Sequence, residues 1–388
     1  MNKNIIYSTI ASFMLFVVGC SQSKNSLGEY YSSTIKIDLD SENFSLNTEG
    51  YSVDSVCHLL LPEGLGIHEI TKFMVKNDRM YVMDSHLDRT IFVFDYSGKF
   101  LFKAGERGRA KNEYMDGPSD FFVDNDDNIH VFDGRAKKII IFGKNGKVTK
   151  TIDVRNYFPQ SFGLLNNNKY AFDFNLDKLD GNTVLALCNE DNEIEKKLLF
   201  RSENYYLIPS EQTFFVNGNR MSHIPLMSDS VLVFNKDMLE KVIKFDFGGR
   251  LLIKENPELA IDKQSEPQDI SAYTGVQYLR SYQESDDLIL LEYVYQRYTI
   301  YWLYDKQKKM VIAKDYGLTD GLNPFFTYYL KDRQIVAIVG EEDVEIDRSV
   351  PDFDEKEFMK NYNRSTTPIK EMFDGKAKLP AVVFISIK

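Results

Sequence analysis

Between residues 70 and 148, apolar and polar positions follow a pattern that is typical of short β-strands joined by tight turns. The stretch 117–148 reads GPSDFFVDNDDNIHVFDGRAKKIIIFGKNGKV, with three β-branched or aromatic runs separated by Asn, Asp and Gly. The stretch 70–100 reads ITKFMVKNDRMYVMDSHLDRTIFVFDYSGKF and has the same order of runs, 48 residues earlier. Two copies of one strand meander predict a repeat architecture.

The two copies align position by position. Phe73 corresponds to Phe121 at an offset of 48, and Tyr81 to His130 at an offset of 49, because the second copy has one extra residue in its acidic turn. The runs 91–94 and 139–142 are apolar at every position. Strands that are apolar on both faces suit sheets stacked face to face around an axis, as in a β-propeller.

The same reading divides the rest of the chain into further blades. Blades are expected at about 66–104, 117–155, 159–201, 216–249 and 270–317, with a sixth containing 324–342. A ring of sheets must close or leave exposed edges, so the runs 34–39 (TIKIDL) and 381–388 (AVVFISIK) are expected to share blade six. Residues 51–61 are expected to form an edge or linking strand, and 352–362 a short helix. Seven blades remain the alternative to six, because blades three and four have diverged.

The residues 120–147 carry the order D-F-x-V-D-x-x-x-N-I-x-V-x-D, then I-x-x-F and G-K, which resembles an NHL-type propeller repeat. The loop 105–114 (GERGRAKNEY) resembles the linker G-x-G-P-G-E-[FY] between such repeats, with Lys111 and Asn112 where Pro-Gly is usual. The whole plan resembles a family of six-bladed β-propeller lipoproteins, most of them functionally uncharacterised. The resemblance implies an all-β, NHL/TolB-like six-bladed propeller of four-stranded antiparallel blades, closed by both termini. The close match covers residues 70–150.

The first residues resemble a bacterial lipoprotein signal. Lys3 precedes a mostly apolar run, 5–18, that is too short for a lasting transmembrane helix, and the run ends at Gly19-Cys20. The resemblance implies cleavage after residue 19 and lipidation of Cys20; an ordinary signal with a chance cysteine is the alternative. Residues 20–33 then form the lipidated Cys and a flexible tether, and 34–388 a single propeller domain. Ser21 after the Cys favours the outer membrane, and the lack of an acidic run favours its periplasmic face.

The composition argues against nucleic acid as a partner, and the sequence contains no metal-binding motif. The net charge of −11 and the absence of a basic stripe argue against nucleic-acid binding. Five His residues show no metal-ligand spacing, so no metal or cofactor is expected. The acidic run 124–128 is expected to be a turn rather than a calcium loop, and His130 a packed ring. Cys57 and Cys188 are expected to be separate buried thiols.

Two loops are candidate ligand-binding elements. The first is the connection 105–114, with Arg107, Arg109, Glu113 and Tyr114, because binding residues concentrate on loops held by a rigid scaffold. The alternative is that Glu113 and Tyr114 only fix the junction between two blades. The second is a hairpin within 293–304, with Tyr295 and Arg297 near its turn, although tyrosine is also a common strand residue.

Three functions remain open. The first, which we favour, is a lipid-anchored binding or interaction module for a saccharide, a peptide or an envelope protein, held at the membrane through Cys20. The second is a metal-dependent hydrolase or lyase, lactonase-like, with an axial site for which Asp120, Glu69 and Asp269 are candidates. The third is a structural subunit of an envelope complex. No catalytic constellation marks the chain as an enzyme, and fold alone does not choose among these functions.

Overall fold

The structure, a computed structural model, describes most of the chain from residue 31 onward. The described residues are 31–47, 49–68, 70–166, 169–174, 179–189, 191–201, 213–217, 219–255, 273–296, 298–315, 327–339 and 380–388. The predicted signal peptide 1–19, the lipidation site Cys20 and the predicted helix 352–362 lie outside them. Within the described residues, no helix has the length and apolar character needed to cross a bilayer.

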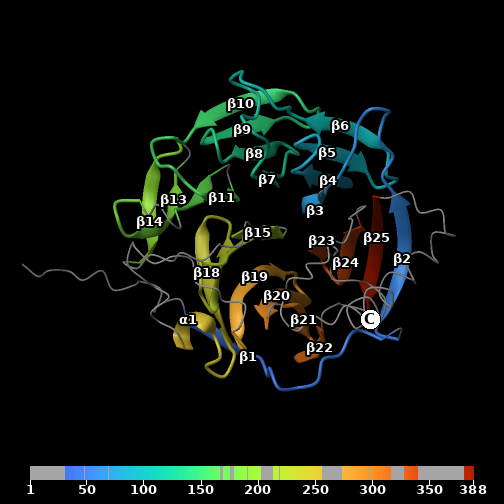
Figure 1. Cartoon of the computed structure of the whole chain (residues 1–388), viewed down its shortest axis with the longest axis vertical. Helices are drawn as coiled ribbons and strands as arrows, with labels where there is room; N and C mark the ends of the chain where they lie inside the picture. The colour runs from blue at the N-terminus through green and yellow to red at the C-terminus, as the bar shows by residue number, and fades with distance from the viewer. Residues whose placement is uncertain are drawn as a thin grey trace, which may run out of the picture.

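The described residues form six β-sheets arranged as blades around a central axis, with one short helix, α1 (Leu252–Glu255) (Figure 1). Each of the six sheets contains four antiparallel strands, which follow chain order in five sheets, whereas in the sixth the N-terminal strand follows the C-terminal one; one sheet carries a fifth strand. The protein is therefore a six-bladed β-propeller, as the sequence predicts, and the seven-bladed alternative is excluded.

The first three blades follow the chain directly, each beginning with its innermost strand. Blade one contains β3 (Ile70–Lys76), β4 (Arg79–Asp84), β5 (Thr90–Asp95) and β6 (Phe100–Ala104). Blade two contains β7 (Asp120–Val123), β8 (Ile129–Asp133), β9 (Lys138–Phe142) and β10 (Val148–Asp153). Blade three contains β11 (Ser161–Leu164), β12 (Tyr170–Asp173), β13 (Thr183–Cys188) and β14 (Ile194–Phe200).

Two of the last three blades incorporate an N-terminal strand. Blade four contains β15 (Phe214–Asn217), β16 (Arg220–His223), β17 (Ser230–Asn235), β18 (Met238–Asp246) and the added strand β1 (Tyr31–Lys36). Blade five contains β19 (Val276–Glu284), β20 (Leu288–Tyr295), β21 (Tyr298–Asp305) and β22 (Met310–Asp315). Blade six contains β23 (Thr327–Lys331), β24 (Gln334–Val339), β25 (Ala381–Ile387) and β2 (Tyr51–His58).

The two ends of the chain close the ring, but not with the N-terminal strand that the sequence predicts. β2 pairs antiparallel with β25 from Tyr51–Ile387 to His58–Ala381, and the two lie side by side in Figure 1. The run 34–39 was wrongly assigned to blade six: β1, which covers its first half, pairs in parallel with β18 of blade four. Both segments alternate in polarity, so their pattern does not reveal which edge each one joins. The exposed side chains of Ser33, Thr34 and Lys36 suit an outer edge strand.

The packing between blades follows from strands that are apolar on both faces. Ile91, Phe92, Val93 and Phe94 of β5 are fully buried, as are Ile139 and Ile140 of β9. Complete burial of one such side chain contributes about 1.5–3 kcal/mol. The two-faced apolar runs of the sequence therefore form the middle of blades that are covered by a neighbour on each side.

Two smaller expectations are also met. His130 is fully buried, with Nδ1 2.7 Å from the hydroxyl of Tyr170 in blade three and Nε2 3.1 Å from Oδ2 of Asp124. Asp124 Oδ1 accepts the backbone N–H groups of Asp126 and Asn128, both at 2.8 Å, so the acidic segment is a turn. Burial acts to raise the pKa of Asp124, but the hydrogen bonds to His130 and Asn128 outweigh it and lower the pKa to about 2.

The cysteines Cys57 and Cys188 are both buried and not disulfide-bonded, as expected. Burial raises the pKa of the Cys188 thiol to about 12. Such a thiol stays protonated near neutral pH and behaves as a small apolar side chain.

The closing strands allow a direct test. Val383 is fully buried in β25, opposite Val56 of β2 and Ala337 of β24. We expect Val383→Asp to lower the free energy of unfolding by at least about 3 kcal/mol, because a carboxylate there has no partner. Ser33→Asp in the exposed edge strand β1 is the matched control, with an expected change within about 0.5 kcal/mol. Guanidinium denaturation measures both, and equal effects would contradict the closing role of β25.

Candidate functional site

The candidate loop lies at one end of the ring, which we call the crossover face. In an antiparallel four-stranded blade, the connection to the next blade and the turn between the second and third strands lie at the same end. For blade two these segments are the incoming connection 105–119 and the turn 134–137. The turns between first and second strands lie at the opposite end, which we call the turn face.

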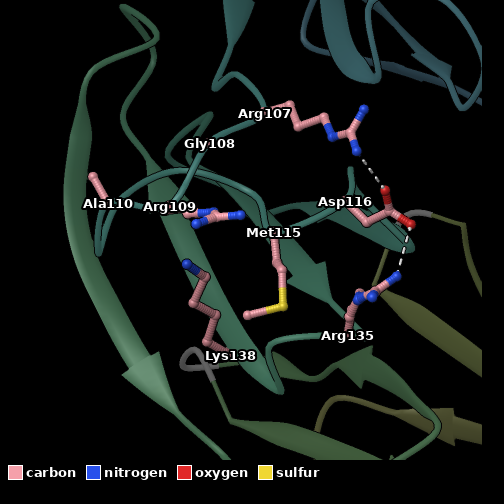
Figure 2. Close-up of a pocket in the computed structure, with 8 residues that line it drawn as sticks. All are labelled: Arg107, Gly108, Arg109, Ala110, Met115, Asp116, Arg135 and Lys138. Atoms are coloured by element: carbon pink, nitrogen blue, oxygen red, sulfur yellow. Dashed lines mark ion pairs between the residues drawn. The ribbon is translucent and has the colours of Figure 1, made fainter.

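A cavity of about 680 Å³ opens on the crossover face at the junction of blades one and two. We call it the junction cavity; it is lined by Arg107, Gly108, Arg109, Ala110, Met115, Asp116, Arg135 and Lys138 (Figure 2). The first six residues come from the connection between β6 and β7, and the last two from the turn before β9 and its first residue. Two segments that are 19 residues apart at their nearest (116 and 135) thus form one wall.

The connection is held in shape by its own backbone. The N–H of Gly108 donates to the carbonyl of Tyr114 at 2.8 Å, and the N–H of Tyr114 donates to the carbonyl of Glu106 at 2.9 Å. Glu113 Oε2 accepts the N–H of Ala110 at 2.8 Å. A Cβ at position 108 would lie 1.9 Å from that Glu113 oxygen, so a larger residue there would displace the Glu113 carboxylate. These bonds fold 106–114 into a compact loop that projects Arg107 and Arg109 outward.

Tyr114 anchors this loop from beneath. Its side chain is fully buried, and its hydroxyl donates to the carbonyl of Ala104 at 2.6 Å. Burial raises the pKa of the phenol well above its usual value. The ring also lies 2.6 Å from where a Cβ would stand at Gly105, whose φ of 84° favours glycine. Tyr114 and Glu113 therefore fix the blade junction, as the alternative interpretation of the sequence has it, whereas Arg107 and Arg109 line the cavity.

Asp116 lies between three guanidinium groups. Arg89 Nη1 is 2.6 Å from Asp116 Oδ1 and also donates to the Asp116 carbonyl at 3.2 Å. Arg107 Nη2 and Arg135 Nη1 lie 3.5 Å from Oδ1 and Oδ2, on the two sides of the carboxylate (Figure 2). The side chains of Arg107 and Arg135 are 60% and 68% exposed. Arg89 is thus part of the scaffold, whereas the other two guanidiniums keep most of their N–H groups toward solvent.

A buried carboxylate positions the two segments of the wall. Asp133, at the end of β8, accepts the N–H of Met115 through Oδ2 and the N–H of Ala136 through Oδ1, both at 2.8 Å. Lys138 Nζ donates to the carbonyl of Glu113 at 2.6 Å. The sequence analysis did not single out Asp116, Arg135 or Lys138. The signal that could have helped is Asp133, which occupies the same repeat position as Asp84.

Asp84 plays the same part in blade one. Its Oδ1 accepts the N–H of His68 at 2.9 Å, and its Oδ2 accepts the N–H groups of Asp88 and Arg89 at 2.9 and 3.2 Å. In both blades, therefore, the aspartate that ends the second strand ties the incoming connection to the next turn.

The second predicted cluster does not join the junction cavity. Tyr295 pairs with Tyr298, as the hairpin prediction requires, and lies on the crossover face of blade five. Its half-buried ring packs in the core cluster shared by blades four and five. Arg297 lies outside the described residues. The structure thus brings Arg107 and Arg109 together and leaves Tyr295 in a different part of the ring.

Of the three residues proposed for an axial metal site, the structure describes Asp120, which forms an ion pair with a lysine. Asp120 Oδ1 lies 2.6 Å from Lys72 Nζ, and both side chains are buried. Burial lowers the pKa of Lys72 and raises that of Asp120. Asp120 is therefore half of a buried ion pair between blades one and two. Glu69 and Asp269 lie outside the described residues, among which no group of three or more His, Cys, Asp or Glu side chains could hold a metal ion.

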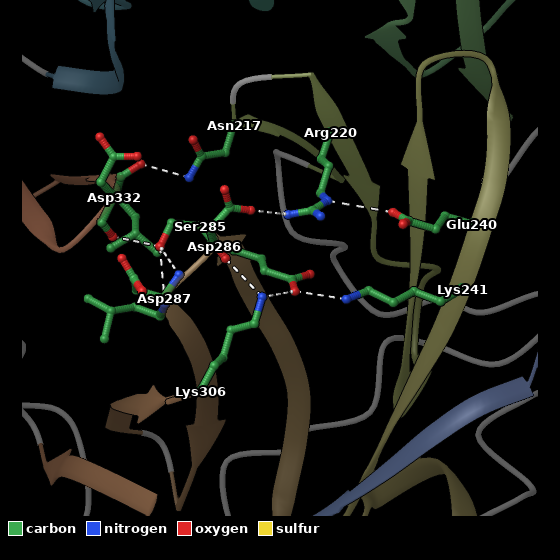
Figure 3. Close-up of polar contacts among 12 residues, drawn as sticks. Asn217, Arg220, Glu240, Lys241, Ser285, Asp286, Asp287, Lys306 and Asp332 are labelled. Atoms are coloured by element: carbon green, nitrogen blue, oxygen red, sulfur yellow. Dashed lines mark hydrogen bonds and ion pairs between the residues drawn. The ribbon is translucent and has the colours of Figure 1, made fainter. Parts of the chain in front are cut away.

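On the turn face, charged side chains of blades four and five pair closely (Figure 3). Arg220 Nη1 lies 2.9 Å from Asp286 Oδ1, and its Nε lies 3.5 Å from Glu240. Glu284 Oε1 accepts from Lys241 and Lys306, both at 2.7 Å. Burial acts to raise the pKa of Glu284, but its two lysine partners outweigh it and lower the pKa. These charges connect blades, and each has a partner at short range.

A tyrosine substitution tests whether Tyr114 supports the loop without taking part in ligand binding. We expect Tyr114→Phe to lower the free energy of unfolding by about 1 kcal/mol, because it removes a buried hydrogen bond to Ala104, and to leave ligand affinity unchanged. Tyr304→Phe, at a partly exposed tyrosine of blade five, is the control. Thermal and denaturant unfolding give the stability. Undiminished stability of Tyr114→Phe would show that the hydroxyl does not hold the loop.

Several solved structures resemble this chain at low sequence identity. A protein of Bacteroides fragilis, named as an inferred exported protein, is 14% identical with a TM-score of 0.71, over 92% of this chain and 100% of its own. A DUF4221 family member from Bacteroides vulgatus is 10% identical with a TM-score of 0.46, over 87% and 97%. Virginiamycin B lyase from Staphylococcus aureus is 9% identical with a TM-score of 0.40, over 74% and 86%. The first shows a common fold, and the other two scores are too low to support an argument.

Comparison with curated proteins gives no match. A family described as a domain of unknown function, DUF4934, matches residues 66–369. This range runs from the connection before β3 to beyond β24 and so includes the whole junction cavity. The chain therefore belongs to the DUF4934 family.

Proposed function

We propose that this protein is a lipid-anchored propeller of the cell envelope that binds a ligand, a saccharide or a peptide, in the junction cavity. The observation that carries the proposal is the cavity itself, of about 680 Å³, into which the connecting loop projects Arg107 and Arg109. Its volume is in the range of cavities that hold small-molecule ligands, about 300–1,000 Å³. The fold shared with an inferred exported protein agrees with an envelope address.

The loop has the properties of a binding element on a rigid support. Its backbone bonds, the buried Tyr114 and the carboxylate of Asp133 hold it before any ligand arrives. A preformed site loses little conformational entropy on binding. The loop also follows a repeat that resembles the NHL type, and we propose that blades one and two are NHL-like repeats whose linker has acquired cationic side chains.

The anchor part of the proposal rests on the N-terminal residues. Cleavage before Cys20 and acylation of that cysteine would leave residues 21–30 as a polar tether between the membrane and β1, which begins at Tyr31 and so shortens the tether expected from the sequence. Two or more acyl chains hold a protein stably at a bilayer, because each buried CH₂ contributes about 0.8 kcal/mol. We place the propeller on the periplasmic side of the outer membrane.

Blocking the cavity tests the binding function. Met115 is 51% exposed in the cavity wall, and Met238 is 69% exposed at the start of β18 in blade four. We expect Met115→Trp to weaken binding of any ligand found on saccharide and peptide arrays by at least about tenfold, because the indole occupies the cavity. Met238→Trp should leave affinity unchanged. Retained affinity in Met115→Trp would place the ligand elsewhere.

Metabolic labelling tests the anchor. We expect the wild-type chain, expressed with its own N-terminus in a bacterial host, to incorporate radiolabelled palmitate and to sediment with outer membranes. Cys20→Ala should lose the label and leave the membrane fraction, whereas Ser21→Ala should keep both. Label or sedimentation in Cys20→Ala at the wild-type level would contradict the anchor.

A further inference from the structure

We propose that the junction cavity recognises an acidic oligosaccharide, one whose sugar residues carry carboxylate or sulfate groups. The inference rests on the proposed binding function and names the class of ligand. Three features of the cavity support it: its positive charge, the loose pairing of its arginines and the scarcity of apolar side chains in its lining.

The charge of the cavity is opposite to that of the chain. Its lining contains four cationic side chains, Arg107, Arg109, Arg135 and Lys138, and one carboxylate, Asp116. Lys138 Nζ also lies 3.9 Å from the buried carboxylate of Asp133, which leaves two positive charges in excess. The whole chain carries a net charge of −11. A concentration of positive charge in an acidic protein is not a consequence of its composition. A concave cationic surface attracts anions and raises their association rate.

Two arginines of the cavity are less closely paired with a carboxylate than three other arginines of the protein. Arg220 lies 2.9 Å from Asp286, Arg333 lies 2.8 Å from Asp305, and Arg250 lies 2.9 Å from Asp40. Arg107 and Arg135 approach Asp116 only to 3.5 Å, beyond the usual length of a charge-assisted hydrogen bond. One carboxylate, already hydrogen-bonded to Arg89, is shared among three guanidiniums.

Asp116 shows where an anionic group can be bound. Its two carboxylate oxygens face different guanidiniums, Arg107 above and Arg135 below in Figure 2. Arg89 holds Asp116 in place. Arg107 and Arg135 each approach this carboxylate with one nitrogen, so their other N–H groups do not contact Asp116. A planar guanidinium matches carboxylate, sulfate or phosphate oxygens in pairs. A ligand with two anionic groups would neutralise the excess charge.

The surface of the lining favours a charged saccharide over an acidic peptide. Peptide and protein interfaces depend on a few buried apolar or aromatic anchors. The lining offers only Ala110 and the half-exposed Met115 as apolar side chains, and none of its eight residues is aromatic. Recognition must therefore depend mainly on charge and hydrogen bonds. An oligosaccharide with an anionic group on successive residues supplies both without an apolar anchor.

Calorimetry with the full-length protein in detergent tests the inference. The probes are an oligogalacturonate, a heparin-derived oligosaccharide, a poly-glutamate peptide and neutral maltohexaose, each at low and high NaCl. The variants are Arg107→Glu with Arg135→Glu, and the milder Arg107→Gln with Arg135→Gln. The charge-matched control is Lys150→Glu with Lys196→Glu, at two exposed lysines on outer strands. Asp116→Asn, which keeps an oxygen for Arg89, is the fourth variant.

We expect one of the two acidic oligosaccharides to bind, and its identity distinguishes carboxylate from sulfate recognition. The Glu pair should weaken binding by at least about tenfold and the Gln pair by less, because reversal adds repulsion to the loss of attraction. Asp116→Asn should tighten binding several-fold, because it removes the only negative charge of the lining. The Lys control should stay within about twofold, and affinity should fall with added salt.

Other outcomes overturn the inference in distinguishable ways. Binding of maltohexaose or the peptide alone, blocked by Met115→Trp, would reject the acidic saccharide and keep the junction cavity as a binding site. Equal losses in the Arg and Lys pairs would show non-specific attraction to a polyanion and reject the inference. If no ligand on the saccharide and peptide arrays is sensitive to Met115→Trp, the proposed function itself fails.

Discussion

Every blade of this propeller has two apolar faces, and a sheet with two apolar faces is stable only between two other sheets. The middle strands β5 and β9 expose almost none of their side chains. Blade one therefore needs blade six as much as it needs blade two. Pairing of β2 with β25 completes blade six, and Phe384 of β25 packs edge-on against Tyr96 of blade one, with ring centroids 5.7 Å apart. The closed ring is thus a condition for the burial of every blade.

In the closed ring, the innermost strand of each blade has one edge without a neighbouring strand. Side chains from adjacent blades form hydrogen bonds with some of the backbone groups on these edges. Gln283 of blade five accepts from the N–H of Leu330 and donates to the carbonyl of Tyr328, both at 2.8 Å. Lys76 of blade one donates to the carbonyl of Val123 in blade two at 2.9 Å. These contacts protect strand edges that could otherwise pair with another chain.

The two ends of the ring use charge differently. On the turn face, Arg220 and Glu284 have close partners in neighbouring blades, and these contacts connect the blades (Figure 3). On the crossover face, Asp133 and Tyr114 hold the loop, while Arg107 and Arg135 share one carboxylate and project into the junction cavity. The same residue types therefore pair closely within the scaffold at one end and remain partly exposed in a cavity at the other.

The sequence by itself determined what depends on neighbouring residues. The alternation and turn residues of 70–150 specify two meanders, the two-faced apolar runs specify stacked blades, and the acidic turn at Asp124 follows from its own side-chain hydrogen bonds. The loop 105–114 was also identifiable as a connection between repeats, with Arg107 and Arg109 as candidate ligand residues.

Only the tertiary structure decided what depends on closure of the ring. It assigned β2 rather than β1 to blade six, because two alternating strands look alike until their partners are known. It brought Arg135 and Lys138 to the loop 105–116, and it separated Tyr295 from them. Local patterns encode which residues form strands and turns. The edges that pair and the loops that face one another are set by contacts between distant segments, which no local pattern contains.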